Sequence, residues 1–192
     1  MKITGKHIGK KFRKNWIFRD LNFEFSSGET VAITGKNGAG KSTLIQIIAG
    51  YLTPSEGEIL IDGKPIDDPS PQTTFVGPYT EIIEEFTLGE FLKFHSKFKT
   101  PACTIEEMAQ SASLPLNKVI GEFSTGMKQR ARLITAFFFE NDLIFLDEPT
   151  SNLDAEGFDW WKSQLERFDK RLVFIASNDP GEINVCSKQL SL

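Results

Sequence analysis

One glycine-rich turn constrains this chain more than any other stretch of its sequence. It follows the apolar run Val31–Ile33, which is typical of a strand, and it precedes a helical pattern of apolar residues. The turn consists of Gly35, Lys36, Asn37, Gly38, Ala39, Gly40, Lys41 and Ser42. Such a strand, turn and helix predict a phosphate-binding loop, because backbone N–H groups and the positive end of the helix dipole attract an anion.

Each part of this loop has an expected chemical role. The glycines allow backbone conformations and a close approach that a Cβ would obstruct. Lys41 is expected to reach the β- and γ-phosphates of a nucleotide, and the Ser42 hydroxyl is expected to bind Mg²⁺. Thr43, the next residue of the helix, is also a nucleotide-binding candidate. The alternative is a chance turn with a surface lysine, and the flanking strand and helix argue against it.

Composition and charge place the chain among ordinary globular proteins. Its 192 residues are 40% hydrophobic, so we expect one domain over 1–192. The formal net charge of −4 gives no general attraction to nucleic acid, and nucleic acid is not an expected partner. One basic stretch, interleaved with Phe12 and Trp16, suggests a surface for nucleic acid or anionic lipid, but a solvated strand edge is favoured. Its basic residues are Lys6, Lys10, Lys11, Arg13 and Lys14.

Cysteine, histidine and apolar patterns bear on the compartment. Cys103 and Cys186 are far apart and do not join the histidines in a metal-ligand pattern, so we expect a reducing compartment and no structural metal. The N-terminus lacks the apolar core of a signal peptide, and no apolar run approaches the ~20 residues that span a bilayer. The longest run, Ala136–Phe139, predicts a buried helix end. We therefore expect a cytoplasmic protein that another chain would hold at any membrane.

The periodicity of apolar residues predicts an α/β fold. Antiparallel strands are expected within 2–25, and further strands at Thr30–Thr34, Glu58–Ile61, Thr73–Val76, Leu143–Leu146 and Leu172–Ala176. Helices are expected from Lys41 to about Gly50, in two segments between 86 and 112, from near Ser124, and from Ala155 to about Phe168. A turn is expected at Asp62–Pro65. The middle third of the chain therefore looks like a helical insert in a sheet protein.

Two adjacent carboxylates form the second chemical group. The apolar run Leu143–Leu146 delivers Asp147 and Glu148 to the C-terminal end of a strand, where ligands bind in open α/β sheets. In an enzyme with a phosphate-binding loop, the first carboxylate holds the Mg²⁺ shell and the second can take a proton from the attacking water. Strands often end in acidic turns, so the pair alone means little. Its place after Lys41 and before Pro149–Asp154 favours the functional interpretation.

These motifs together resemble those of the ATP-binding subunit of an ABC transporter, over nearly the whole chain. The matching segments are Gly35–Ser42 for Walker A, Leu143–Glu148 for Walker B, Ser151–Asp154 for the D-loop and Phe123–Arg130 for the LSGGQ signature. Phe12 or Trp16 falls where the family places the aromatic residue that stacks on adenine.

The resemblance implies a P-loop NTPase fold with a RecA-like parallel sheet core, an N-terminal antiparallel β-subdomain and a helical subdomain over roughly 78–140. It also implies a head-to-tail pair of domains, with ATP between the Walker A loop of one and the signature of the other. Ser124 and the backbone at Gly126 would then donate to the γ-phosphate at the start of a helix. A plain helix N-cap at Ser124 is the alternative, and both can hold together.

Two departures concern the signature and the segment after the strand Thr73–Val76. Phe123, Thr125 and Met127 stand where the family usually has Leu, Gly and Gln, which weakens the signature. The family also places a glutamine directly after the strand, and none stands at positions 77–79. Gln72 lies at the opposite end of that strand, so it cannot be assumed to substitute.

The third departure is Asn178, which stands where the family has a switch histidine. An amide can donate one hydrogen bond to a γ-phosphate oxygen, but it cannot carry the charge of an imidazolium. Because Lys41 and Glu148 are retained, the catalytic set of Glu148, Lys41 and Asn178 predicts slow hydrolysis rather than none.

The predicted function is that of a cytoplasmic subunit, peripheral at the cytoplasmic face of a membrane. It would slowly hydrolyse ATP with Mg²⁺ at a dimer interface and drive a separate membrane-spanning permease. The partner in the dimer would be an identical chain or a second nucleotide-binding subunit. One alternative is a nucleotide-gated switch that does not hydrolyse ATP, favoured by positions 77–79 and 178 and opposed by Glu148. Another is a soluble ABC-type ATPase that takes no part in transport.

Overall fold

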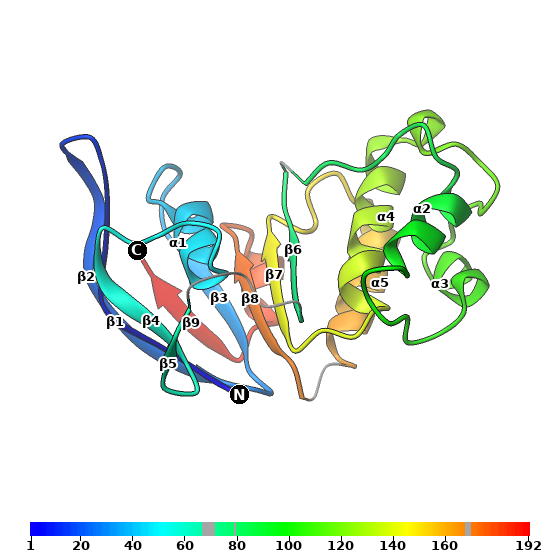
Figure 1. Ribbon diagram of the computed structural model, residues 1–192. Coiled ribbons are helices and arrows are strands. Elements are labelled where there is room, and N and C mark those ends of the chain that lie inside the picture. The colour runs from blue at the N-terminus through cyan, green and yellow to red at the C-terminus, as the bar shows by residue number, and fades with distance from the viewer. Residues whose placement is uncertain (67–71, 79, 168–169) are drawn as a thin grey trace. The chain divides into compact units, whose positions relative to one another are not determined.

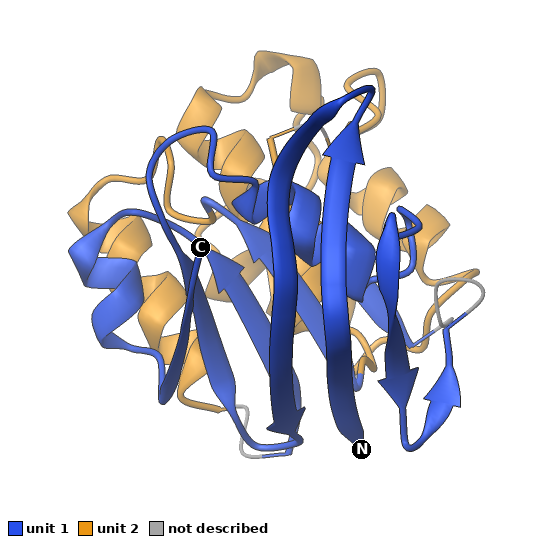
Figure 2. Cartoon of the chain, turned by 90° about the vertical axis from the view of Figure 1, so that its left-hand side faces the viewer, with its two compact units in different colours: residues 1–75, 142–148, 169–192 blue, residues 76–141, 149–168 orange. Residues whose placement is uncertain are grey.

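A computed structural model describes residues 1–66, 72–78, 80–167 and 170–192. The chain divides into two compact units, unit 1 with residues 1–75, 142–148 and 169–192, and unit 2 with residues 76–141 and 149–168 (Figure 2). Two positions named in the sequence analysis lie outside the described residues. They are Tyr79, in the segment without a glutamine, and Phe168, the expected end of the helix that begins at Ala155. One domain over 1–192 with a helical subdomain over roughly 78–140 stays a prediction.

Unit 1 is built on two sheets. The antiparallel sheet has the order β2-β1-β4-β5, with β1 Lys2–Phe12, β2 Asn15–Ser26, β4 Glu56–Ile61 and β5 Lys64–Pro65. The second sheet has the order β6-β7-β8-β3-β9, with β3 Thr30–Thr34, β6 Thr73–Val76, β7 Leu143–Asp147, β8 Leu172–Ala176 and β9 Lys188–Ser191. Strands β7, β8, β3 and β9 pair in parallel. The predicted parallel and antiparallel parts of the fold are confirmed.

The core of unit 1 surrounds helix α1, Lys41–Ile48, which lies between the two sheets (Figure 1). The five residues of β7 and the five of β8 are all buried, as expected for parallel strands covered on both faces. Phe145 and Phe174 stack with ring centroids 5.2 Å apart, and the edge of the Phe25 ring packs against Phe174. This packing fixes the strand ends from which the functional residues project.

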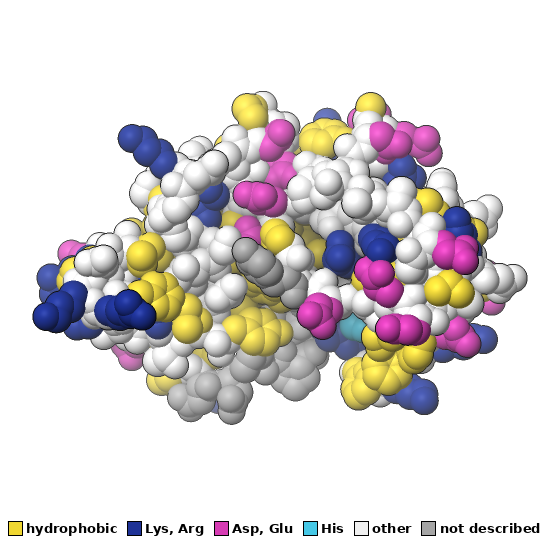
Figure 3. Space-filling view, turned by 90° about the horizontal axis from the view of Figure 1, so that it is seen from above, with side chains coloured by type: hydrophobic (Ala, Val, Ile, Leu, Met, Phe, Trp, Pro, Cys, Tyr) yellow, Lys and Arg dark blue, Asp and Glu magenta, His cyan; other side chains and the backbone are white. Residues whose placement is uncertain are grey.

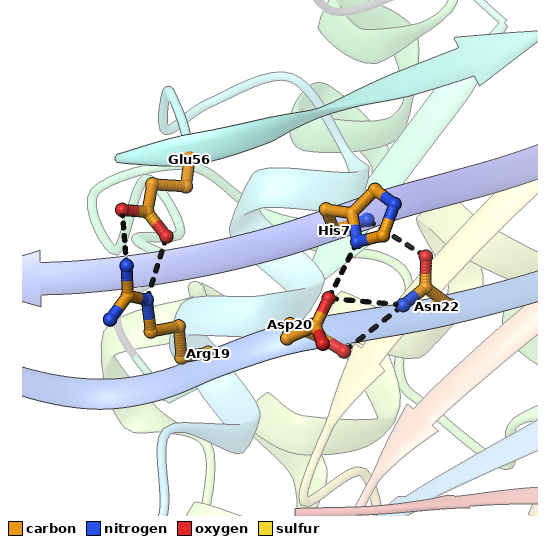
Figure 4. Close-up of polar contacts among 5 residues, drawn as sticks. All are labelled: His7, Arg19, Asp20, Asn22 and Glu56. Atoms are coloured by element: carbon orange, nitrogen blue, oxygen red, sulfur yellow. Dashed lines mark hydrogen bonds and ion pairs between the residues drawn. The ribbon is translucent and has the colours of Figure 1, made fainter.

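Bulges shape the antiparallel sheet. His7 and Asp20 adopt left-handed backbone conformations, with φ of 50° and 59°, and the β1–β2 register shifts beyond Gly5. Side chains tie the irregular strands together: His7 Nδ1 lies 2.6 Å from Asp20 Oδ1, and Arg19 donates two hydrogen bonds, of 2.8 and 2.9 Å, to Glu56 on β4 (Figure 4). The sheet thus keeps its pairing across the bulges.

Several elements differ from the sequence prediction. The turn expected over Asp62–Pro65 is shorter, because Asp62 and Gly63, with φ of 48° and 80°, form a two-residue hairpin turn and Lys64–Pro65 pairs as β5. Helix α6, Pro180–Asn184, and strand β9 were not predicted. Strand β9 is mostly exposed and pairs with β3 at the sheet edge, so its sequence carries no apolar run.

Unit 2 is mainly helical in its described residues. Its helices are α2 Leu88–His95, α3 Ile105–Ser111, the 3₁₀ turn η1 Ile120–Glu122, α4 Thr125–Phe137 and α5 Ala155–Leu165. Capping boxes begin α2 and α3, and side chains of Ser124 and Asp154 cap α4 and α5. The run Ala136–Phe139 is a buried helix end, as predicted. None of the helices in the described residues combines the length and apolarity needed to cross a bilayer.

His95 on α2 is a half-buried titratable group of unit 2. Burial, with a smaller contribution from the charge of Lys99, lowers the pKa of His95 to about 4. Its Nε2 is buried and has no hydrogen-bond partner among the described residues. Its ring packs edge-on against Phe139, with centroids 4.5 Å apart. The folded chain therefore holds His95 neutral where an unfolded chain would protonate it.

We predict that the free energy of unfolding falls as the pH drops from about 6.5, the ordinary pKa of histidine, toward about 4, because the unfolded state binds a proton that the folded state does not. Replacing His95 with Leu should remove this contribution and flatten the fall of Tm between pH 7 and pH 5. His7→Gln, which changes an exposed histidine, serves as the control. Parallel Tm curves for His95→Leu and wild type would contradict the assignment.

Candidate nucleotide-binding site

The glycine-rich loop joins the end of β3 to the start of α1 in unit 1. Gly40 is the N-cap residue of α1, with φ of 98°, and no side chain caps the first turn of the helix. A Cβ on Gly40 would lie 2.4 Å from Cγ2 of Ile17 on β2, so both the backbone conformation and the available space require glycine. The first N–H groups of α1 thus have no side-chain acceptor at the end of the helix that attracts anions.

Lys41 folds back over this loop. Its side chain is 7% exposed, and Nζ donates a hydrogen bond of 3.1 Å to the Gly35 carbonyl. The ammonium group is therefore held at the loop before any ligand is present. Gly35 and Gly38 also have positive φ, of 148° and 82°, conformations that residues with a Cβ disfavour.

Asp147 and Ser42 meet at the end of β7. The Ser42 hydroxyl donates a hydrogen bond to the Asp147 carboxylate, and Asp147 is 4% exposed. Burial raises the pKa of Asp147, while the hydrogen bond from Ser42 and the charge of Lys41 act in the opposite direction. One hydroxyl and one carboxylate brought together in this way are oxygen ligands of the kind that hold a divalent cation such as Mg²⁺. The donor set thus fits the predicted metal.

Glu148 has a different environment from its neighbour. Its side chain is exposed, and its backbone adopts φ of 49°, a left-handed conformation that costs a residue with a Cβ about 1–3 kcal/mol. Its N–H donates 2.9 Å to the Ala176 carbonyl on β8. The two adjacent carboxylates are therefore unlike, one buried beside a hydroxyl and one projecting to solvent from a strained backbone.

Asn178 follows β8 and contacts the glycine-rich loop directly. Its Nδ2 donates a hydrogen bond of 2.6 Å to Asn37 Oδ1. The preceding residue, Ser177, is 1% exposed and donates its N–H to the Ile33 carbonyl of β3. This anchoring places residue 178 beside the loop. The Asn37 contact itself was not predicted, since nothing in the sequence links two amides so far apart.

The two aromatic candidates lie on the β1–β2 hairpin and differ in their surroundings. Phe12 is 50% exposed, with Lys10 Nζ 5.2 Å from its ring centroid. Trp16 is 36% exposed and has two cations near its ring centroid, Lys11 Nζ at 5.2 Å and Arg19 Cζ at 4.5 Å. Figure 3 shows basic side chains gathered beside hydrophobic ones at this end of the molecule, on its left. Phe12 is therefore the less covered of the two rings.

The signature residues belong to unit 2. Ser124 is the N-cap of α4, and its Oγ accepts a hydrogen bond of 3.2 Å from the Met127 N–H, so the plain cap is present. A Cβ on Gly126 would lie 2.7 Å from the Asn152 carbonyl oxygen. Gly126 therefore lets the first turn of α4 approach the loop before α5, a packing reason for glycine that the sequence did not reveal.

Other contacts of this region were also missed from the sequence. Arg130 donates 2.8 Å to Asp154, and Gln129 donates 2.8 Å to the Pro149 carbonyl. In the segment that lacks the family's glutamine, Gly77 N–H donates to Thr80 Oγ1 and Thr80 N–H donates to the Gly77 carbonyl, both at 3.0 Å. The only sequence signal for such a contact is a polar residue in the first turns of a helix, such as Gln129. That signal does not identify which group the residue contacts.

Comparison with known proteins finds a family model and relatives that match most of the chain. The family model described as ABC transporter matches residues 18–151. Over 171 residues the chain is 30% identical to the ABC transporter ATP-binding protein NatA of Bacillus subtilis, covering 81% of this chain and 70% of NatA. It is 32% identical over 164 residues to the cytochrome c biogenesis ATP-binding export protein CcmA of Agrobacterium fabrum, covering 80% of this chain and 77% of CcmA.

A solved structure shares the fold. It is a dimeric post-hydrolysis state of an ATP-binding cassette bound to ADP and Pi, which superposes with a TM-score of 0.85 over 99% of this chain and 94% of the other, at 22% identity. The P-loop fold with a parallel sheet, an antiparallel sheet and helices is thereby confirmed.

We predict that Lys41→Ala nearly abolishes nucleotide binding, because the variant loses the ammonium group that the loop holds in place. The loss should reach at least about tenfold in affinity, since a hydrogen bond to a charged group contributes roughly 1.5–3 kcal/mol. Titration with a fluorescent ATP analogue measures the effect. The control is Lys97→Ala, which removes an exposed lysine of unit 2, and equal affinities for the two variants would refute the role of Lys41.

Proposed function

Because this chain belongs to the ABC transporter family of ATP-binding proteins, we propose that it binds ATP with Mg²⁺ and hydrolyses it slowly at a dimer interface. Hydrolysis would drive a separate membrane-spanning permease. The observation that carries the proposal is the hydrogen bond between Ser42 and the buried Asp147, beside a loop that already holds Lys41. This pairing supports a cation site beside a phosphate site.

The residues of unit 1 divide the chemistry among them. The loop 35–43, including its backbone N–H groups and Lys41, binds the β- and γ-phosphates, and the ring of Phe12 or Trp16 stacks on adenine. Ser42 and Asp147 hold Mg²⁺, which neutralises charge on the phosphates when it is bound. Glu148, exposed and projecting from the strand end, takes the proton of the attacking water.

Asn178 contributes less than a histidine would. One N–H of its Nδ2 donates to Asn37, and the other can donate one hydrogen bond to a γ-phosphate oxygen. The absence of one oriented transition-state donor elsewhere costs on the order of 10²–10³ in rate, which sets the upper scale of the effect here. This is the physical reason for proposing slow turnover.

The dimer completes the site in this proposal. Ser124 and the backbone at Gly126 of one chain donate to the γ-phosphate held by the other, and a capped helix start is suited to that role. The partner is an identical chain or a second nucleotide-binding subunit. The full chain, 1–192, acts as one nucleotide-binding domain with a helical subdomain over roughly 78–140, peripheral at the cytoplasmic face of the membrane that carries the permease.

One alternative has a specific observation in its favour. The 2.6 Å contact between Asn178 and Asn37 engages one of the two N–H groups of this amide and holds the side chain at the loop, and this favours a switch that closes on ATP without hydrolysing it. The exposed carboxylate of Glu148 favours the ATPase, because a switch needs no base there.

We predict that Glu148→Gln retains ATP binding but stops turnover, because an amide cannot accept the proton of the attacking water. Steady-state phosphate release with ATP and Mg²⁺ measures turnover, and sizing of the same samples should show ATP-dependent dimers accumulating in the variant. Turnover equal to wild type would show that the base is misassigned. Stable ATP dimers of the wild type without any phosphate release would favour the switch.

We also predict that Asn178→His accelerates phosphate release, because an imidazole can donate to the γ-phosphate and carry positive charge. The gain should not exceed about 10²–10³-fold, the scale of one transition-state donor. Asn184→His, an equivalent change at an exposed residue at the end of α6, is the matched control. Unchanged rates in both variants would remove Asn178 from the catalytic set.

A further inference from the structure

The loop after β3 and the segment after β8 meet at one edge of the parallel sheet of unit 1. Strands β3 and β8 are neighbours, and their register pairs Ile33 with Ala176 at the last residues of the ladder. Because parallel strands end at the same edge of a sheet, the glycine-rich loop and the segment 177–179 leave it side by side. Asn37 of the loop and Asn178 of the segment are exposed there, and their side chains form a hydrogen bond.

The backbone beside each asparagine is held by hydrogen bonds of its own. The N–H of Ala39 donates 3.0 Å to the carbonyl of Lys36 and closes a β-turn around Asn37. Around the other asparagine, the hydroxyl oxygen of Ser177 accepts a hydrogen bond of 2.8 Å from the N–H of Asp179. Since both backbones are already held, the bond between the two amides chiefly orients the side chains.

This bond also restricts the second donor of the Asn178 amide. Nδ2 of Asn178 donates to Oδ1 of Asn37 over 2.6 Å. A primary amide has two N–H groups in one plane, so a fixed acceptor for one of them sets the direction of the other. An exposed side chain normally loses rotamer freedom when it binds a ligand, and here that freedom is reduced before any ligand is present.

We propose, on the basis of the proposed ATPase function, that Asn37 is a positioning residue for Asn178. By accepting one N–H of the Asn178 amide, it directs the other N–H to an oxygen of the γ-phosphate. A neutral amide is not drawn to the phosphate by charge as an imidazolium is, so it depends on a neighbour for its orientation. An uncharged acceptor suits this place, because a carboxylate at position 37 would repel the phosphates.

The test is a double-mutant cycle of Asn37→Ala and Asn178→Ala, measured by steady-state phosphate release with ATP and Mg²⁺. We expect Asn37→Ala to lower kcat about fivefold, the scale of one neutral hydrogen bond, with KM for ATP within about twofold of wild type. In the Asn178→Ala background the same change should leave kcat unaltered, because the residue that Asn37 positions is absent. The matched control is Asn184→Ala, which changes an exposed asparagine of unit 1 and should behave as wild type.

Asn37→Asp tests the acceptor separately from the rest of the side chain. Its carboxylate can still accept from Nδ2 of Asn178, so kcat should stay within about twofold of wild type, whereas the added charge should raise KM. A fivefold loss of kcat in this variant, like an unchanged kcat in Asn37→Ala, overturns the proposal.

Two further outcomes of the cycle would overturn the proposal. If Asn37→Ala lowers kcat equally in the Asn178→Ala background, Asn37 acts without Asn178. If Asn37→Ala instead raises kcat, the contact restrains the amide and does not direct it, and that result would favour the switch that closes on ATP without hydrolysing it.

A measurement without nucleotide separates this proposal from the proposed function. The NMR signals of the side-chain NH₂ group of Asn178 should shift in Asn37→Ala and stay in place in Asn184→Ala. Unshifted signals in Asn37→Ala would overturn the positioning role even if the wild type hydrolyses ATP. Shifted signals in a chain that releases no phosphate would show that the two amides pair in solution, and would reject the ATPase together with the role of the pair in hydrolysis.

Discussion

The burial of one carboxylate governs the arrangement of unit 1. Asp147 ends a strand that is covered on both faces, so its charge has to be offset by a donor within reach, and the Ser42 hydroxyl is that donor. Helix α1, which carries Ser42, is held in place by its packing between the two sheets. The loop before it packs against β2 at Gly40. The geometry of the site therefore depends on the packing of the core, because the burial of apolar neighbours fixes the position of each strand end.

The sequence predicts what depends on local patterns and misses what depends on distant pairs. Leu172–Ala176 was predicted with its true bounds because a fully buried strand is a continuous apolar run, whereas Lys188–Ser191 is a polar edge strand that only its pairing with β3 defines. In the site, the loop and the two carboxylates follow from composition and spacing. The contact between Asn178 and Asn37 does not, because amide side chains form hydrogen bonds with many partners and the fold alone chooses this one.

Several residues of the candidate site serve packing as well as the chemistry that the resemblance implies. Ser124 caps a helix, and Gly126 makes room for a carbonyl oxygen of the same unit. A weakened signature can therefore keep these two residues for structural reasons alone, and their presence is weaker support for catalysis than the pairing of Ser42 with Asp147. The departures in sequence are likewise informative only together with their surroundings. Positions 77–79 have no glutamine, but the carbonyl of Thr80, the next residue, accepts a hydrogen bond from Arg132.

The contact between Gly40 and β2 has a consequence for exchanging parts between related proteins. Ile17 and Phe18 lie against the space that a Cβ on Gly40 would occupy, so the antiparallel sheet forms one wall of the loop. A chimera that takes this sheet from a relative would change the shape of that wall and, with it, the backbone that meets the phosphates. Recombination boundaries placed between β2 and β3 would therefore succeed only where the donor sheet carries side chains of matching size at these two positions.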